Sequence, residues 1–168
     1  ALEPVGVLML VVTDSLVLRP LDRTDRALYI QLYTDAAVMR YIGACLKTEV
    51  ASASFDKALA LQGRQSVFAP RWVLLDTGTN QRSGLLGLFA DGPAAEIGLM
   101  LLPSAQGRGL AGAALHAMVE RVFAKAWVRS LWARHAPGNG AMAAVLRSLG
   151  FHVECETEAE CRWRLVRA

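Results

Sequence analysis

The sequence predicts one α/β domain with a mixed, mostly antiparallel central sheet of about six or seven strands and about four flanking helices. Three observations support this. The chain has 168 residues, which suits a single domain, and no internal repeat or low-complexity linker divides it. Runs with strand periodicity alternate with runs of helical periodicity. In the middle of the chain, three strand-like runs are separated only by turn-forming residues. We expect one domain over residues 13–168 and an N-terminal extension or extra strand over residues 1–12.

The first part of the chain predicts a strand followed by helices. Residues 15–20 alternate apolar and polar side chains and end at a proline, which is typical of a strand. Asp22 can cap a following helix, and Asp35 can begin a second short turn. Thr48 is placed to cap a longer helix over about residues 49–62, where apolar side chains recur at helical spacing.

The middle of the chain changes to strand periodicity. Residues 71–75, 84–89 and 96–102 form three apolar runs separated by Asp-, Gly-, Asn- and Pro-containing stretches. Short connections of this kind predict a meander of antiparallel strands. A helix over about residues 109–126 follows, because its apolar side chains form a single stripe.

The last part predicts two more helix-to-strand transitions. Residues 130–135 form a strand, and Asn139 can cap the next helix. Gly150 ends that helix as a glycine placed just after the last turn. Residues 151–156 and 161–166 are the final two strands.

Composition excludes several classes of protein. Apolar residues make up 54% of the chain, and the formal net charge of +3 is small for a nucleic-acid-binding protein. The longest apolar run, residues 5–12, has about half the length of a membrane span. The three cysteines, Cys45, Cys155 and Cys161, do not form a zinc-binding pattern. We expect a cytoplasmic protein with no metal, no nucleic-acid partner and no membrane partner.

A glycine-rich loop lies where the third middle strand is followed by a helix. The segment reads Gln106-Gly107-Arg108-Gly109-Leu110-Ala111-Gly112. Glycines allow backbone N–H groups to approach a ligand closely, and the start of a helix adds unpaired donors and a partial positive charge. The loop therefore predicts a phosphate or pyrophosphate site.

A nicotinamide dinucleotide is one alternative ligand for this loop. Gly107, Gly109 and Gly112 match the spacing of the dinucleotide fingerprint. However, residues 103–106 separate the first glycine from the strand, and residues 131–135 hold no carboxylate for a ribose. This alternative is disfavoured.

The same loop resembles the acyl-CoA-binding signature of a known family. Gln106 to Ala111 match the Q/R-x-x-G-x-G/A signature of the GNAT acetyltransferases. Residues 13–21, 35–43, 96–98 and 139–151 resemble, in the same order, stretches of the branch that acetylates the N-termini of ribosomal proteins, the Rim-type branch. The resemblance extends from about Thr13 to the end of the chain.

This resemblance implies a GNAT fold that binds acetyl-CoA in a V-shaped opening between splayed strands. It assigns backbone contacts with the pantetheine arm to Met100, Leu101 and Leu102. It assigns the pyrophosphate to the backbone amides of Gln106, Gly107, Arg108, Gly109, Leu110 and Ala111. Asn139 would contact the pantetheine side. Proteins of this branch commonly pair, so a homodimer is also expected.

The chemistry that the resemblance implies is direct attack of a neutral amine on a thioester. A base must accept the amine proton, and the departing thiolate needs a proton. Glu96 is the candidate base, because it is the only carboxylate in residues 94–102 and precedes the loop at the spacing of the strand glutamate in related enzymes.

The general acid is where the sequence departs from the family. The positions that commonly carry a tyrosine or a serine are here Leu146 and Met142. Tyr41, His135 and Ser148 are the possible substitutes. The thiolate could also leave unassisted.

We expect an N-acetyltransferase that moves an acetyl group from acetyl-CoA to a primary amine, either a protein N-terminus or a small-molecule amine. Because the usual acid positions are apolar, a non-catalytic acyl-CoA-binding or sensing domain is the alternative. The sequence does not identify the acceptor.

Overall fold

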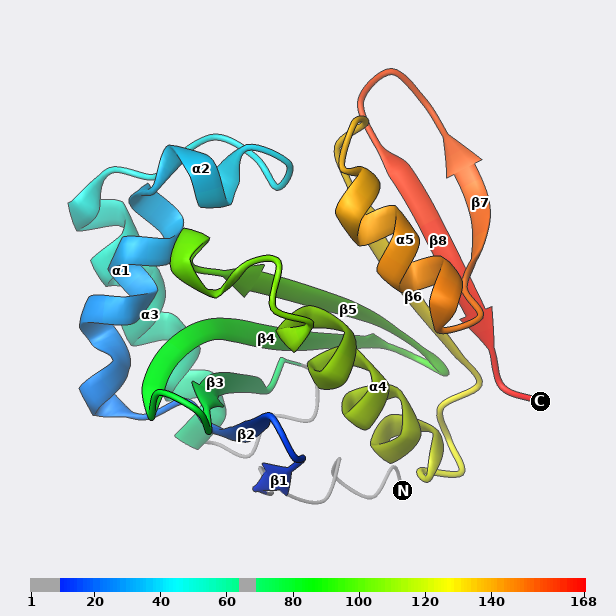
Figure 1. Cartoon of the computed structure of the whole chain (residues 1–168), viewed down its shortest axis with the longest axis horizontal. Coiled ribbons are helices and arrows are strands. Elements are labelled where there is room, and N and C mark those ends of the chain that lie inside the picture. Colours follow the sequence, from blue (N-terminus) through cyan, green and yellow to red (C-terminus); the bar gives the residue numbers. More distant parts are fainter. Residues whose placement is uncertain (1–9, 64–68) are drawn as a thin grey trace.

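The computed structural model describes residues 10–63 and 69–168 (Figure 1). Its strands are β1 (Val11–Val12), β2 (Leu16–Pro20), β3 (Arg71–Asp76), β4 (Gln81–Asp91), β5 (Ala94–Leu101), β6 (Ser130–His135), β7 (His152–Glu156) and β8 (Cys161–Val166). Its α-helices are α1 (Arg26–Thr34), α2 (Ala36–Met39), α3 (Thr48–Gly63), α4 (Leu110–Phe123) and α5 (Gly140–Ser148). Two 3₁₀ turns, η1 (Arg23–Asp25) and η2 (Pro103–Ala105), precede α1 and the glycine-rich loop.

The described strands form one sheet in the order β1-β2-β3-β4-β5-β6-β8-β7. Every neighbouring pair is antiparallel except β5 and β6, which run parallel. The predicted α/β class, the mostly antiparallel sheet and the central meander of β3, β4 and β5 are therefore confirmed.

The described residues contain more elements than predicted. There are eight strands instead of six or seven, and five α-helices instead of four. The eighth strand, β1, has only two residues and lies within residues 1–12, for which the sequence predicted an extension or an extra strand. The added helix, α2, has four residues, and its Asp35 cap was interpreted as the start of a turn. Residues 1–9 of the predicted extension lie outside the described residues.

Local signals in the sequence account for the start and end of several helices. The Asn139 side chain accepts a hydrogen bond from the Met142 N–H at 3.1 Å and so caps α5. Gly150 follows α5 with φ of +85°, a conformation that favours glycine. Asp22 caps η1 rather than α1, because the chain makes one 3₁₀ turn before the α-helix begins at Arg26.

The two faces of the sheet carry different helices (Figure 1). On one face, α1 and α3 pack against Val73, Leu85 and Met100. On the other face, the buried side of α4 belongs to a larger apolar cluster that also includes Leu86 and Ile97. The two clusters fix the middle strands between helical layers.

The sheet opens where β5 meets β6. The two strands pair only over Ala94–Glu96 and Ser130–Trp132. Beyond Trp132, β6 pairs with β8 alone, and residues 97–101 of β5 keep hydrogen-bonded partners only on the β4 side. In Figure 1, β6, β8 and α5 turn away from β5 at this point. The V-shaped opening implied by the resemblance is therefore a feature of this sheet.

A buried carboxylate at the start of α1 predicts a large effect on stability. The fully buried Asp25 contacts Arg19 at 2.6 Å and Arg82 at 3.3 Å. Because Asp25→Ala leaves both guanidinium groups without this partner, we expect the free energy of unfolding to fall by about 3 kcal/mol. Asp56→Ala, which breaks an exposed pair with Arg26, should cost less than about 1 kcal/mol. Urea titrations measure both, and equal losses would contradict this account.

Candidate active site

Two cavities meet at the opening between β5 and β6. We call the first the loop cavity; it has about 470 Å³ and lies between the end of β5, the glycine-rich loop and the starts of α4 and α5. We call the second the arginine cavity; it has about 730 Å³ and lies over the middle strands on the face that carries α1 and α3. The residues that line both cavities are Arg40, Tyr41, Ile42, Leu99 and Met100.

Eight of the ten residues predicted to bind acetyl-CoA line the loop cavity. They are Met100, Leu101, Gln106, Gly107, Gly109, Leu110, Ala111 and Asn139. Leu102 is not in this lining; its side chain packs against the apolar cluster of α1 and α3, its backbone N–H donates to the Ser83 carbonyl, and its carbonyl accepts from the Ala105 N–H. Arg108 is also outside the lining.

The glycine-rich loop has the shape that an anion site requires. Gly107 and Gly109 have φ of +71° and +75°, and an added Cβ at either position would meet no atom within 4 Å. The first hydrogen bond of α4 runs from Ala113 to the Gly109 carbonyl, so the N–H groups of the first helical residues have no partner within the helix. Open space beside unpaired donors fits a pyrophosphate.

The free edge of β5 forms the adjoining wall of the loop cavity. Met100 and Leu101 lie where β6 no longer pairs with β5. The Gln106 side chain donates to the Leu101 carbonyl at 3.2 Å, which ties the loop to this edge. An extended chain with amide groups, such as a pantetheine arm, can hydrogen-bond to an unpaired strand edge. The donors and acceptors present therefore fit acetyl-CoA.

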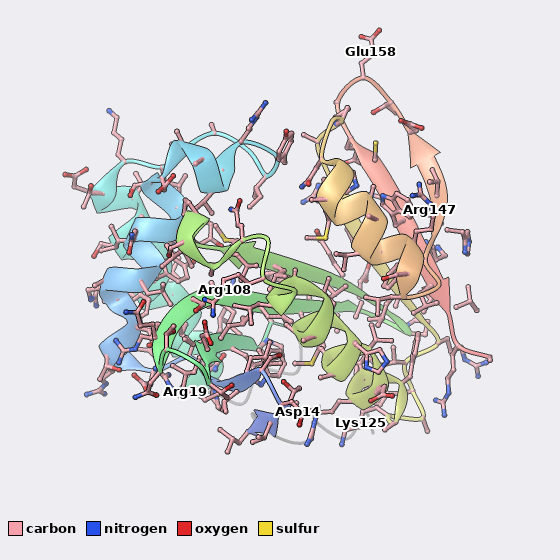
Figure 2. All side chains as sticks on the ribbon, viewed as in Figure 1. Asp14, Arg19, Arg108, Lys125, Arg147 and Glu158 are labelled. Carbon is pink, nitrogen blue, oxygen red and sulfur yellow. The ribbon has the colours of Figure 1, made fainter. Side chains whose placement is uncertain are left out.

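Arg108 holds the loop in place instead of facing the loop cavity. Its side chain, labelled in Figure 2, reaches Asp76 at the end of β3 at 2.5 Å. Burial alone would raise the pKa of Asp76. Hydrogen bonds from the Gly78 N–H and from Arg108 outweigh it and hold the pKa below its ordinary value. The ion pair connects the loop to the β3–β4 hairpin.

The arginine cavity is built on one face of three neighbouring strands. Arg71, Gly87 and Gly98 lie side by side across β3, β4 and β5, and Phe89 lies beside Glu96 in the next row. All five line the cavity. The floor is open backbone at Gly98, whereas at Gly87 the Phe89 ring covers it, 3.0 Å from where a Cβ would stand.

The predicted base, Glu96, faces the arginine cavity but is not free of partners. Its Oε1 accepts a hydrogen bond from the Arg134 Nε at 3.1 Å, and its side chain is 20% exposed. Arg134 also lies 3.7 Å from Glu160. The guanidinium binds Oε1, and the other carboxylate oxygen has no hydrogen bond from the described residues.

The three candidate acids occupy different environments. Ser148 donates to the Val145 carbonyl at 2.7 Å and lines neither cavity. His135 lines the arginine cavity, but the Trp163 N–H donates to its Nε2 at 3.0 Å and its Nδ1 lies 2.8 Å from the Ala136 carbonyl. Since an indole N–H can only donate, Nε2 is the acceptor and Nδ1 carries the proton. Both nitrogens of His135 are thereby occupied.

Tyr41 is the candidate acid that lines both cavities. Its backbone carbonyl accepts from the Ala136 N–H at 2.9 Å, which fixes the segment after α2 against the end of β6. The Arg40 guanidinium lies 5.0 Å from the centre of its ring. Of the two family acid positions, Leu146 is completely buried in the core and Met142 lines the loop cavity.

Sequence reasoning missed Arg40, Arg71, Arg134 and Glu160 as parts of the site. Arg134 and Glu96 come together because β5 and β6 run parallel in one particular register, and no short motif encodes that register. Arg71 begins β3, and the apolar pattern of that run predicts a strand without indicating a binding role for its first residue. The only available signal was an arginine near one end of two strands, Arg71 at the start of β3 and Arg134 next to the end of β6.

No helix in the part of the chain that the structure describes is long and apolar enough to cross a bilayer. The same residues contain no group of three or more His, Cys, Asp or Glu side chains that could hold a metal ion.

Solved structures with the same fold come from several acetyltransferases. An acetyltransferase from Agrobacterium tumefaciens shares 20% identity, with a TM-score of 0.80 and 96% of each chain covered. The ribosomal L7/L12 α-N-protein acetyltransferase RimL, in complex with coenzyme A, shares 21% identity, with a TM-score of 0.78 over 94% of this chain and 98% of that chain. Spermidine N-acetyltransferase from Vibrio cholerae, in complex with coenzyme A and spermine, shares 19% identity, with a TM-score of 0.76 over 92% and 96%.

The family assignment comes from the sequence itself. No curated protein sequence matches the chain significantly. The family model of the acetyltransferase (GNAT) domain matches residues 15–152, which is most of the chain. That match spans the glycine-rich loop, the splayed strands and α5. The chain therefore belongs to the GNAT family of acetyltransferases.

Proposed function

We propose that the chain transfers an acetyl group from acetyl-CoA to a primary amine, either a protein N-terminus or a small-molecule amine. The observation that carries this proposal is the meeting of two cavities at the opening between β5 and β6, with Tyr41 and Met100 in the wall of both. One cavity suits acetyl-CoA, and the other leaves room for an acceptor beside Glu96. Such an arrangement holds two reactants in one complex, which is how positioning lowers a barrier.

The loop cavity would hold acetyl-CoA through its backbone. The N–H groups from Gln106 to Ala111 would bind the pyrophosphate, and the edge of Met100 and Leu101 would pair with the pantetheine arm. Asn139, which lines the same cavity, would contact the pantetheine side. Acetyl-CoA supplies the acetyl group in activated form, as a thioester.

Glu96 would act as the base. The acceptor's neutral amine attacks the acetyl carbonyl carbon, a C–N bond forms and the C–S bond breaks. The proton lost by the amine passes to Glu96 directly or through one water. The hydrogen bond from Arg134 holds the Glu96 carboxylate in position.

Tyr41 would protonate the departing thiolate, because it is the one candidate acid that lines both cavities. Tyr41→Phe keeps the ring and removes the hydroxyl. We expect kcat to fall about 10²-fold while the Kd for acetyl-CoA stays unchanged. Steady-state release of free thiol measures kcat, with Ser148→Ala as a control that should have no effect. Full turnover by Tyr41→Phe would mean that the thiolate leaves unassisted.

A non-catalytic acyl-CoA sensor is the second candidate, favoured by the apolar residues at the two family acid positions. Leu146 is fully buried and Met142 has no ionisable group. Thiol release in the presence of a panel of amines and N-terminal peptides separates the two functions. An enzyme releases thiol only when a suitable amine is present, whereas a sensor binds acetyl-CoA and releases none above background.

A further inference from the structure

We propose that the amine acceptor also carries a carboxylate, and that Arg71 in the arginine cavity binds it. This inference rests on the proposed function and names the class of acceptor that the same site would take. The carboxylate can belong to a free amino acid or to an acidic residue next to a peptide's N-terminus. In both sources the chemistry is an anion close to a primary amine.

The arginine cavity has more basic than acidic side chains in its lining. Three arginines, Arg40, Arg71 and Arg134, line it together with two carboxylates, Glu96 and Glu160. Both carboxylates contact Arg134, at 3.1 and 3.7 Å, and Glu160 also contacts Arg162 from outside the lining at 3.7 Å. The carboxylates of the cavity are therefore already engaged with other arginines.

Arg40 and Arg71 have no such partner among the described residues. Within residues 10–63 and 69–168, neither side chain forms an ion pair. Residues 64–68 contain no acidic side chain that could supply one. Each guanidinium instead lies over an aromatic ring, Arg40 over Tyr41 at 5.0 Å and Arg71 over Phe89 at 5.1 Å. Stacking leaves the edge of a guanidinium available for a carboxylate.

Arg71 is held firmly at its place in the sheet. Its backbone N–H donates to the Gln62 side chain at 2.9 Å, and its carbonyl accepts from the same side chain at 2.7 Å. Gln62 is only 5% exposed. The Arg71 guanidinium donates one hydrogen bond, to the Ala69 carbonyl at 3.0 Å. The fixed backbone, the hydrogen bond to Ala69 and the contact with the Phe89 ring give the guanidinium a defined direction. The side chain therefore loses little conformational entropy when it binds an anion.

The floor of the cavity between Arg71 and Glu96 consists of the Phe89 ring, which covers Gly87, and the open backbone of Gly98. Gly87 and Gly98 lie next to Arg71 in the same row, and an added Cβ at Gly98 would meet nothing within 4 Å. With strands about 4.8 Å apart, the backbone of Arg71 is about 10 Å from that of Gly98. The long arginine side chain spans part of that gap. A compact acceptor that lies over the Phe89 ring and the open backbone of Gly98 can place its carboxylate at Arg71 and its amine beside Glu96.

The same charges disfavour a polyamine as acceptor. A polyamine would bring further positive charge to a cavity where two guanidinium groups form no ion pair with any residue that the structure describes, and like charges in a confined site repel. The pattern therefore distinguishes this chain from the Vibrio cholerae neighbour, whose structure holds spermine.

Matched acceptors test the inference. The first comparison is between free α-amino acids and their α-amides. The second is between two sets of C-terminally amidated peptides that differ only at the second position, which is Asp in one set and Asn in the other. The first pair of substrates tests a main-chain carboxylate and the second tests an acidic side chain. In at least one pair the acid should have a kcat/KM about 10- to 100-fold above that of its amide, which is the usual effect of a charge-assisted hydrogen bond.

The variant Arg71→Gln should bring that ratio close to one, while the Kd for acetyl-CoA remains that of the unaltered protein. Arg147→Met is the control, because Arg147 also stacks on an aromatic ring, Trp163, but lies on α5 outside the arginine cavity (Figure 2). It should leave the ratio unchanged.

Two results would overturn the inference and leave the proposed function standing. One is equal kcat/KM for acids and amides, or a better rate with spermidine than with any acid. The other is an acid preference that persists in Arg71→Gln. If acetyl-CoA binds but no amine of any class is acetylated, the proposed function fails, and the inference fails with it.

Discussion

Replacing Gly109 with Val is expected to raise the Kd for acetyl-CoA about 10- to 100-fold in a protein that remains folded. Gly109 has φ of +75° at the start of α4, where a β-branched residue is strained by about 1–3 kcal/mol. The loop escapes this strain by changing its backbone, which turns its N–H groups away from the pyrophosphate. Binding must then restore the strained shape, and each 1.4 kcal/mol is a factor of about ten in Kd.

Gly92→Val provides the matched control for Gly109→Val. Gly92 also has positive φ, of +58°, and open space for a side chain, but it lies in the β4–β5 turn outside both cavities. This variant should lose a similar amount of stability and keep its affinity for acetyl-CoA. Calorimetry measures affinity and thermal unfolding measures stability. An unchanged Kd in a folded Gly109→Val protein would remove the loop from the site.

Glu96→Gln is expected to lower kcat by about 10²–10⁴-fold, the usual contribution of a positioned base, with no change in the Kd for acetyl-CoA. The amide oxygen of Gln can still accept the hydrogen bond from Arg134, so packing and local geometry are preserved. The deficit should shrink as the pH approaches the acceptor's own pKa, because solvent then supplies more neutral amine. The activity of the unaltered enzyme should level off at lower pH.

Glu160→Gln is the control for Glu96→Gln. Glu160 also contacts Arg134 and lines the arginine cavity, but it lies at the end of the β7–β8 connection, away from β5. Turnover by Glu160→Gln should stay within a few-fold of normal. A pH–rate profile of Glu96→Gln that matches the unaltered enzyme would make Glu96 structural, and the base would then be water or solvent.

The order of elements could be predicted because its signals are local. Pro20 ends a strand, Asn139 and Gly150 delimit a helix, and turn residues separate β3, β4 and β5. The arrangement of strands in the sheet is different. The parallel pairing of β5 with β6, and the place of β8 between β6 and β7, depend on contacts between distant segments that residue patterns alone do not specify.

Of the two cavities of the candidate site, one could be predicted from the sequence and the other could not. The loop cavity could be predicted because Gln106 to Ala111 are contiguous and their backbone does the binding. The roles of side chains within that loop could not be predicted. The sequence places Arg108 in the loop, but only the fold brings Asp76 close to it. The arginine cavity is assembled from α1, the segment after α2, and five strands or their connections. No single stretch of sequence carries its pattern, and Arg71 and Arg134 were therefore not predicted.

Transfer of a labelled acetyl group tests the central claim most directly. The chain would be incubated with acetyl-CoA carrying a deuterated acetyl group and with the acceptor panel, and the products identified by mass spectrometry. We predict the label on the nitrogen of a primary amine, one free thiol released for each acetyl transferred, and loss of both products in Gly109→Val at limiting acetyl-CoA. Bound acetyl-CoA that remains intact with every amine would contradict the claim.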